Sequence, residues 1–440
     1  MKSIQRIHGW GRYPIIEAEV NVPLVVSGVK SAVENCGADG LIARGLGRSY
    51  GDGSLASYVI DTRHLTHLLD FDKNTGIVTC NAGISLADIL EVFVPLGWFL
   101  PVTPGTKHIT LGGAVASDVH GKNHHVCGCF CDFVEHIELI VSPDNVLLCS
   151  NTSHSELFHA TCGGMGLTGI ILSVSFRLKP VSSAYIDQKT IKAVNITEAL
   201  ELFEQNYAST YSVAWIDCLA TGSSLGRSLL MIGEHATDHS LSSPAKHAIT
   251  VPVEMPSSLL NRYSIQLFNT LYYNRITKKE VANRVHYEPF FYPLDGIQHW
   301  NRLYGKNGFT QYQFVIPKEA GQEGMTKIVK EIAASGKGSF LAVLKVFGKQ
   351  NDNLLSFPLA GYTLALDFKI EEGLFPLLDR LDAIVLDYGG KIYLTKDVRM
   401  SAPTFRQSYP RWEQFQGIRE QNGTKGIFAS YQSRRLGLDR

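Results

Sequence analysis

The sequence predicts a protein of two domains that mixes helices with strands. Its 440 residues exceed what one ordinary hydrophobic core holds, so the length favours at least two domains. Residues 77–97 have the pattern of a strand followed by a helix, and residues 169–180 have that of an alternating strand. Beyond residue 183 the glycine clusters thin out and aromatic residues become frequent, as is typical of a sheet that packs over a ligand.

The first strand and helix are predicted from 77 onward. The strand begins at "IVTCNAGI", and "SLADILEVFVPLG" follows at 85–97. There Ser85 and Asp88 have the spacing of a capping box ahead of apolar residues at helical spacing. Gly97 is expected to end the helix.

A period-two pattern predicts a half-buried strand within "GIILSVSFRLKP". Pro180 is a natural stop and a candidate domain edge. Apolar and polar positions alternate, with Leu172, Val174, Phe176 and Leu178 against Ser173, Ser175, Arg177 and Lys179.

Composition argues against nucleic-acid-binding, membrane-spanning and disulfide-rich classes of protein. Lys plus Arg and Asp plus Glu both number 41, which gives no support to a broad nucleic-acid-binding surface. The N-terminus lacks the apolar core of a secretory signal, and no run is long enough to span a bilayer, so we expect a soluble protein. The cysteines are too sparse for a disulfide framework, which favours reduced thiols and the cytoplasm. They are Cys36, Cys80, Cys127, Cys129, Cys131, Cys149, Cys162 and Cys218.

A long segment of residues 235–262 is rich in Ser, Pro and His and lacks sustained periodicity. This composition predicts a mobile loop or flap.

Two glycine-rich stretches predict a phosphate cradle. Residues 41–54, "LIARGLGRSYGDGS", run from a short apolar strand into four glycines, and residues 101–125 interleave glycines with hydroxyl and amide side chains. Glycine lets backbone N–H groups approach an anion closely, and nearby hydroxyls add donors. The two stretches could form two walls around a pyrophosphate, or both could be turn-rich loops. In the second stretch these residues are Gly105, Gly112, Gly113, Gly121, Thr106, Thr110, Ser117 and Asn123.

A third stretch, "GGMGLTG", has Gly164, Gly166 and Gly169 at the spacing of a nicotinamide dinucleotide fingerprint. That fingerprint follows a strand and opens a helix. Here a helical "SELFHAT" precedes it and the strand-like "GIILSVSF" follows, so the context argues against a Rossmann fold.

Potential metal ligands gather in "HGKNHHVCGCFC". The ligand types suit zinc, but one-residue spacing between cysteines differs from the pairs of structural zinc sites, and it alternates their direction on a strand. Packing of the cysteines in a core is the favoured interpretation. The potential ligands are His120, His124, His125, Cys127, Cys129 and Cys131.

Four motifs in one order resemble those of the vanillyl-alcohol-oxidase-type FAD oxidoreductases. They are "ARGLGRSYGD" at 43–52, "PGTKHITLGGAVASDVHGKNHH" at 104–125, "GGMGLTGII" at 163–171 and "KIYLTKDVR" at 391–399. Within this family the chain is most similar to oxidases of polyprenylphosphoryl pentoses. The resemblance runs from "GWGR" at 9–12 to "FAS" at 428–430, which is nearly the whole chain.

The resemblance implies an α+β fold of two domains. An FAD-binding domain (PCMH-type), made of two α+β subdomains, is expected at 1–182. A substrate domain is expected at 183–390, with an antiparallel sheet lying over the flavin ring. Residues 391–440 are expected to return to the FAD domain.

The resemblance also implies the cofactor contacts. Some relatives bind the flavin covalently through a histidine, but Arg48 occupies that position here, and an always-charged guanidinium cannot act as that nucleophile. We therefore expect dissociable FAD. The implied FAD contacts are Ala43, Arg44, Gly45, Leu46, Gly47, Arg48, Ser49, Tyr50, Gly51, Asp52, Gly53, Gly105, Thr110, Leu111, Gly112, Gly113, His120, Gly121, Lys122, Asn123, Ile171 and Tyr393.

Lys396 matches the essential lysine of the family, at the end of a strand-like "KIYLT", with Tyr50 and His120 nearby in the pattern. His120 is assigned a binding or orienting role. An ordinary lysine pKa of about 10.4 must fall before Lys396 acts as a base. As an ammonium it could instead polarise the hydroxyl, hold substrate, or steady negative charge on reduced flavin. The implied substrate contacts are Lys122, Gln311, Gln313 and Lys345, and the two glutamines can face one side of a strand.

The implied reaction is oxidation of the 2'-hydroxyl of a polyprenylphosphoryl pentose to the 2'-keto sugar, the first half of a redox epimerisation. An NAD(P)H-dependent short-chain reductase would complete it, and the lipid tail implies a peripheral enzyme at the inner membrane. Thr363, Ala365 and Phe291 replace an Asn, a Cys and a Tyr of the family, which affects substrate detail. An FAD oxidase of a soluble polyol, sugar or lactone and a zinc-stabilised binding protein stay open as alternatives.

Overall fold

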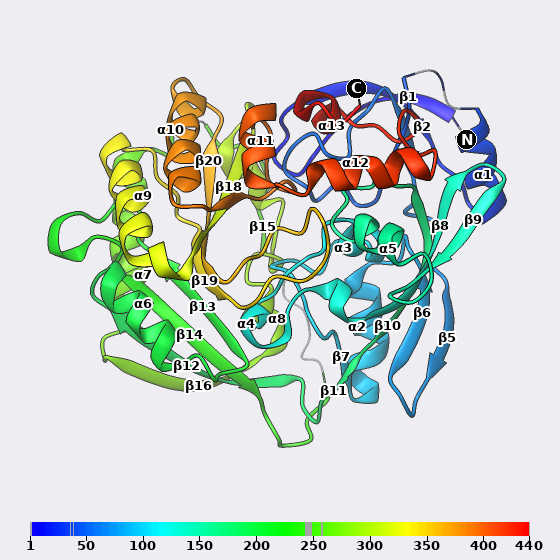
Figure 1. The fold of residues 1–440 in the computed structure, drawn as a ribbon. Helices are drawn as coiled ribbons and strands as arrows, with labels where there is room; N and C mark the ends of the chain where they lie inside the picture. Colours follow the sequence, from blue (N-terminus) through cyan, green and yellow to red (C-terminus); the bar gives the residue numbers. More distant parts are fainter. Residues whose placement is uncertain (1, 36, 38, 243–248, 257, 440) are drawn as a thin grey trace.

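The computed structural model describes residues 2–35, 37, 39–242, 249–256 and 258–439 (Figure 1). The N-terminal part contains two sheets. The first sheet has the strand order β1 (Lys2–His8), β2 (Ile15–Asn21), β4 (Tyr58–Asp61), β3 (Ile42–Arg44). The second sheet is antiparallel. Its strand order is β5 (Leu68–Asp72), β6 (Ile77–Asn81), β10 (Ile170–Arg177), β8 (Val134–Ser142), β9 (Asn145–Cys149). Strand β3 pairs in parallel with β4 and delivers the chain into the first glycine stretch.

Short helices and one small strand pair connect these sheets. They are α1 (Val26–Glu34), α2 (Leu86–Phe93), α3 (Leu111–Ala116), α4 (His124–Cys127), α5 (Ser155–Thr161) and the pair β7 (Trp98–Phe99) with β11 (Lys179–Pro180). The predicted capping box is confirmed: Asp88 N donates to Ser85 Oγ at 3.1 Å, and Ser85 N donates to Asp88 Oδ2 at 3.2 Å. A short 3₁₀ turn, Val94–Leu96, follows α2 and ends at Gly97, whose φ is +83°.

Strand β10 exists as predicted, but its expected half-buried character was wrong. Ser173 and Ser175 are each only 2% exposed, and Ser173 Oγ donates to Glu138 of β8. The strand lies in the middle of its sheet with both faces covered. A register irregularity between Ile171 and Ser173 also places Leu172 in a different apolar cluster from Val174. Periodicity alone does not show such a bulge.

The second half of the chain forms an antiparallel sheet of eight strands. Helices α6 (Ile196–Gln205), α9 (Gly321–Ser335) and α10 (Leu374–Asp387) pack on one face of this sheet (Figure 1). Tyr312 points to this face, where its hydroxyl donates to Asp382 of α10. The strand order is β16 (Glu280–His286), β12 (Tyr185–Ala193), β14 (Ser228–His235), β13 (Tyr211–Ile216), β19 (Ala342–Phe347), β20 (Gly361–Lys369), β18 (Phe309–Pro317), β21 (Lys391–Ile392).

Smaller elements complete this half. Helix α7 (Arg262–Asn274) and helix α8 (Tyr287–Phe291) flank the sheet, and β15 (Ile249–Thr250) pairs in parallel with β17 (Ile297–Gln298). The segment predicted as a flap, residues 235–262, includes 243–248 and 257, which lie outside the described residues.

The last segment of the chain starts in the eight-stranded sheet and ends against the N-terminal part. After β21 come α11 (Ala402–Ser408), α12 (Trp412–Gln421) and α13 (Tyr431–Leu436), and α12 packs against α5 (Figure 1). Leu41 and Phe428 form a parallel bridge. The fully buried Arg419 donates to the Leu167 and Phe428 carbonyls at 3.0 and 2.8 Å, so its charge-assisted bonds join the last segment to the third glycine-rich stretch.

The structure bears on two expectations from the sequence, which concern membrane-spanning helices and cysteine thiols. No helix within the described ranges is long and apolar enough to cross a membrane. The described cysteines have free thiols, and all of them except Cys127 are buried; Cys36 is outside the described residues.

Candidate active site

A cavity of about 1160 Å³ lies between the two glycine-rich stretches and the open face of the eight-stranded sheet. Typical sites for one small ligand have roughly 300–1,000 Å³. The cavity therefore has room for a dinucleotide together with part of a second molecule. Its lining joins all four sequence motifs named above.

The two glycine stretches touch each other at one end of the cavity. A Cβ on Gly45 would lie 2.2 Å from Thr110 Oγ1, so only glycine allows this approach. Gly47 has a φ of +61°, which side chains rarely adopt. Thr110 caps α3 by accepting from Gly113 N at 3.2 Å. The predicted two-walled cradle is thus present as geometry, and its bare backbone fits a diphosphate.

Most of the residues expected to contact FAD line the cavity. They are Ala43, Arg44, Gly45, Leu46, Gly47, Arg48, Ser49, Tyr50, Gly53, Gly105, Thr110, Gly112, Gly113, His120, Gly121, Lys122, Ile171 and Tyr393. All four expected substrate contacts line it too, as does Lys396.

Four of the expected contacts lie outside the lining. A Cβ on Gly51 would meet the Asp397 carbonyl at 1.8 Å, and Asp52 is paired with Arg435 at 2.7 Å. Leu111 is fully buried in the main core, and Asn123 donates to the Pro101 carbonyl. These residues support the walls from behind.

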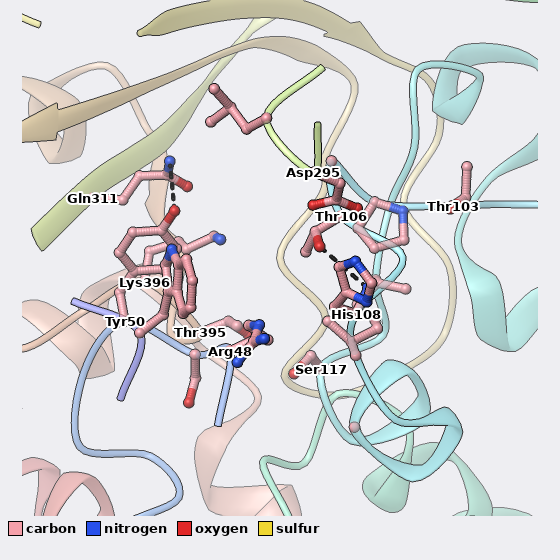
Figure 2. A pocket seen from close by; sticks show the side chains of 18 of the residues that line it. Arg48, Tyr50, Thr103, Thr106, His108, Ser117, Asp295, Gln311, Thr395 and Lys396 are labelled. Carbon is pink, nitrogen blue, oxygen red and sulfur yellow. Dashed lines mark hydrogen bonds between the residues drawn. The ribbon is translucent and has the colours of Figure 1, made fainter. Parts of the chain in front are cut away.

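Strand β18 carries two glutamines into the cavity, as alternation predicts. Gln311 Nε2 donates to Asp367 Oδ1 at 2.6 Å and lies 3.5 Å from the Tyr50 hydroxyl. Figure 2 shows Gln311, Tyr50 and Lys396 together on one side of the cavity, opposite Asp295 and His108. Gln311 thereby connects the sheet to the first glycine stretch.

Lys396 comes from a turn rather than from the end of a strand. Strand β21 ends at Ile392, and Lys396 N donates back to the Tyr393 carbonyl at 3.1 Å, so the expected longer strand was wrong. The Lys396 ammonium lies 4.2 Å from the centre of the Tyr50 ring, which favours the cation. Burial nevertheless lowers the pKa of Lys396 to about 8, while the charge of Asp367 opposes that change.

Asp367 is the carboxyl group whose charge acts on this lysine. It is fully buried behind Gln311, and burial raises the pKa of Asp367 to about 7, against the hydrogen bond from Gln311 and the charge of Lys396. Burial thus brings the pKa values of Lys396 and Asp367 close to each other, as is common at catalytic sites.

Two more lysines are buried in the cavity. Burial lowers the pKa of Lys345 to about 7, with a smaller contribution from the charge of Lys396. Burial and the charge of Lys345 lower the pKa of Lys122 to about 7. The Lys122 ammonium donates to the Phe290 carbonyl and lies 4.4 Å from the Phe290 ring centre. An anion in the cavity would favour the charged form of each lysine.

His120 is enclosed by the rings of Phe347, Phe357 and Tyr393. Burial, with the charge of Lys345, keeps the pKa of His120 well below its usual value, so the imidazole is neutral. Its Nε2 lies 3.0 Å from Gln313 Nε2, which places the His120 proton on Nδ1. That buried Nδ1 has no partner among the described residues, which fits an acceptor atom of a bound molecule.

The cluster of potential metal ligands is dispersed. Within the described ranges, no group of three or more His, Cys, Asp or Glu side chains could hold a metal ion. Cys127 ends α4, and Cys131 lies in a 3₁₀ turn, Phe130–Phe133, so the assumed strand was wrong. Gly348 N donates to His124 Nδ1 at 3.1 Å. A backbone group bonds one ring nitrogen of His124 and one of His125, and Cys129 and Cys131 are packed in the interior.

Several lining residues and one residue behind the lining were missed by the sequence reasoning. Asp367 could have been found, since it shares a strand face with Thr363 and Ala365 of the same motif. Asp295 had no signal, because a lone acidic residue in a loop is ordinary. The other missed polar or aromatic lining residues include Trp10, Thr62, Thr103, His108, Trp300 and Thr395.

Charge in the cavity is strongly one-sided, although the chain as a whole has formal net charge zero. Among the described residues, the lining contains one acidic side chain, Asp295. The basic side chains are Arg44, Arg48, Lys122, Arg275, Lys345 and Lys396. This excess of cationic over acidic side chains around the cavity favours an anionic occupant, as the phosphates of FAD are.

Comparison with known proteins agrees with this geometry. A model of the FAD binding domain matches residues 23–149. The decaprenylphosphoryl-β-D-ribose oxidase of Mycolicibacterium smegmatis is 38% identical over 99% of this chain and 98% of its own length. The L-gulono-1,4-lactone dehydrogenase of Mycobacterium tuberculosis is 22% identical over 90% of this chain and 89% of its own. The L-gulonolactone oxidase of Scyliorhinus torazame is 29% identical over 31% of this chain and 32% of its own.

These matches identify the cofactor, the fold and the family. FAD is the cofactor, and the fold is the two-domain α+β fold of vanillyl-alcohol-oxidase-type flavoproteins. The chain belongs to the decaprenylphosphoryl-β-D-ribose oxidase family of FAD-dependent oxidoreductases.

Proposed function

We propose that this protein oxidises the 2'-hydroxyl of decaprenylphosphoryl-β-D-ribose, or of a close polyprenylphosphoryl pentose, to the 2'-keto sugar. The observation that carries the proposal is one cavity in which buried Lys396, Gln311 and Tyr50 adjoin a glycine cradle for FAD. The full-length similarity to an oxidase named for that substrate supports it.

Bound FAD supplies the acceptor for the hydride that leaves the carbinol carbon. Lys396 takes the hydroxyl proton at Nζ, because a pKa of about 8 leaves a useful fraction of neutral amine near neutral pH. Carbon thus loses a hydride and oxygen a proton, and a C=O bond forms. Gln311 and Gln313 orient the sugar hydroxyls from one strand face, and the Tyr50 ring favours the ammonium that results.

Lys122 and Lys345 are proposed to bind the phosphate end of the substrate. Each has a pKa near 7 through burial, so an incoming anion stabilises its charged form.

His120 is proposed to orient the cofactor through its Nδ1–H. Thr103 also lines the cavity, and a hydrogen bond of 2.6 Å between its hydroxyl and that of buried Tyr292 fixes its position.

FAD is proposed to be non-covalent. Arg48 occupies the position of the linking histidine, and its guanidinium lies 4.4 Å from the Trp10 ring centre and donates to the Leu46 carbonyl. Acid denaturation is therefore expected to release the flavin into the supernatant. Flavin that stays with the precipitated chain would contradict this.

We propose that the FAD-binding domain consists of residues 1–182 with 391–440, and that the substrate domain consists of residues 183–390.

The keto sugar needs a reductase to become the opposite epimer, so an NAD(P)H-dependent short-chain reductase is the proposed partner. A polyprenyl tail favours lipid over water, which supports peripheral contact with a membrane.

A soluble lactone or polyol is the second candidate substrate, because two relatives are named for gulonolactone chemistry. Turnover of FAD-loaded protein on a polyprenylphosphoryl pentose in detergent, against L-gulonolactone and sugar alcohols, separates the two. We expect oxidation of the lipid-linked pentose only. Comparable or faster turnover of a soluble compound would reject the proposal.

A further inference from the structure

Helix α7 presents an apolar face to solvent. Its inward face consists of Ile265, Asn269 and Tyr273, all buried. The opposite face carries Tyr263, Leu267, Phe268 and Leu271, which are 80%, 63%, 42% and 64% exposed, together with exposed Thr270 and Asn274. A surface helix ordinarily turns polar side chains outward, so four large apolar side chains exposed on one helix indicate something that covers them.

This face lies next to residues that line the cavity. Tyr272 and Arg275, at the end of α7, line the cavity itself. On another side, β15 pairs with β17, whose Ile297 lines the cavity, and Ile249 of β15 is 72% exposed. Exposed apolar side chains therefore lie next to residues that line the cavity.

The charged side chains of α7 and of the turn that follows it are basic, although Lys279 pairs with Glu198 and Glu280 comes next in the chain. Residues 262–279 contain four basic side chains and no acidic one. Arg262, Lys278 and Arg275 are exposed, and the Arg275 guanidinium lies 3.8 Å from the centre of the Tyr272 ring. Cations that flank an apolar helical face match a bilayer with anionic headgroups better than they match water.

We propose that the outer face of α7 docks the protein on an anionic phospholipid bilayer, with the cavity mouth facing the lipid. Tyr263, Leu267, Phe268 and Leu271 insert into the headgroup region, and the flanking arginines and Lys278 contact phosphates. The proposal deepens the proposed function, because docking lets a polyprenyl tail stay in lipid while the sugar enters the cavity. Binding to lipid itself does not depend on the identity of the substrate.

The test uses FAD-loaded protein and vesicles of phosphatidylcholine with phosphatidylglycerol, or of phosphatidylcholine alone, in flotation assays. The variant Leu267→Gln/Leu271→Gln removes the centre of the face without touching the cavity lining. The matched control is Leu69→Gln/Leu148→Gln, whose two leucines are each 52% exposed on β5 and β9. Flavin absorbance and the monomer fraction establish that each variant is folded and unaggregated.

We expect wild type and control to float with the anionic vesicles, and to do so less at high salt. The α7 variant should bind these vesicles at least about tenfold more weakly, a factor that corresponds to about 1.4 kcal/mol. Equal binding of the α7 variant, or no vesicle binding by wild type, would overturn the proposal. So would a wild-type dimer that the α7 substitutions dissociate, because the face would then cover a second copy.

Activity separates this proposal from the proposed function. Docking predicts that the α7 variant loses turnover of long-chain substrate in vesicles but keeps turnover of a short-chain, water-soluble analogue. Suppose that wild type and the α7 variant oxidise neither the long-chain substrate nor its short-chain analogue, while vesicle binding still depends on α7. The proposed function then fails and the docking surface stands.

Discussion

The ammonium of Lys396 lies 4.2 Å from the centre of the Tyr50 ring. Tyr50 belongs to the first glycine stretch and Lys396 to the segment that follows the eight-stranded sheet, so this contact joins the cofactor cradle to the group proposed to handle the proton. Gln311 completes the arrangement from the sheet side (Figure 2).

Replacing Lys396 by Ala is expected to leave FAD bound but to slow flavin bleaching by substrate at least about 10²-fold, the usual loss when an acid–base group is removed. Lys349→Ala, at an exposed position, serves as the control and should bleach at the wild-type rate. Anaerobic stopped-flow absorbance measures both. An unchanged rate in Lys396→Ala would remove this residue from the mechanism.

The pH profile distinguishes a base from a cation. If neutral Lys396 accepts the proton, kcat/KM rises with pH through about 8, the pKa of its buried ammonium. A profile that falls above pH 8 would instead require the ammonium. Asp367 raises the Lys396 pKa, so Asp367→Asn should shift the rising limb to lower pH, whereas exposed Asp70→Asn should not shift it.

Gly45→Ala tests the cradle. The new Cβ would lie 2.2 Å from Thr110 Oγ1 and would force the two glycine stretches apart. We expect affinity for FAD to fall at least about tenfold, or about 1.4 kcal/mol. Gly417→Ala, where a Cβ meets nothing within 4 Å, is the matched control. Fluorescence titration of apo-protein with FAD measures both, and equal affinities would show that the close approach is unimportant.

Arg435 tests how the C-terminal segment supports the site. It pairs with Asp52 at 2.7 Å and with Asp397 at 2.9 Å, and both carboxylates are buried. Arg435→Met would leave them without their cation, at an expected cost of about 3–5 kcal/mol of unfolding free energy. Arg380→Met breaks the more exposed pair with Glu331 and should cost about 0–1 kcal/mol. Denaturant titration compares the two, and similar losses would contradict the account.

Local sequence rules identified the features that depend on neighbouring residues. The Ser85–Asp88 capping box and the positions of Gln311 and Gln313 on one face follow from helical and strand spacing, and the structure has both. The glycine stretches were recognisable because bare backbone near an anion requires glycine at particular positions.

Features that depend on distant residues were not predictable in this way. The bulge in β10 depends on its partner β8, and the closeness of Gly45 to Thr110 depends on how two loops pack. The pKa of Lys396 depends on burial by the sheet and on Asp367. Tertiary contacts, which periodicity does not encode, determine all three.

Anaerobic mixing of FAD-loaded protein with decaprenylphosphoryl-β-D-ribose tests the central claim most directly. The account predicts bleaching of the flavin and a product lighter by two hydrogen atoms with a ketone at C2'. Flavin that stays oxidised, or a ketone at another carbon, would contradict it.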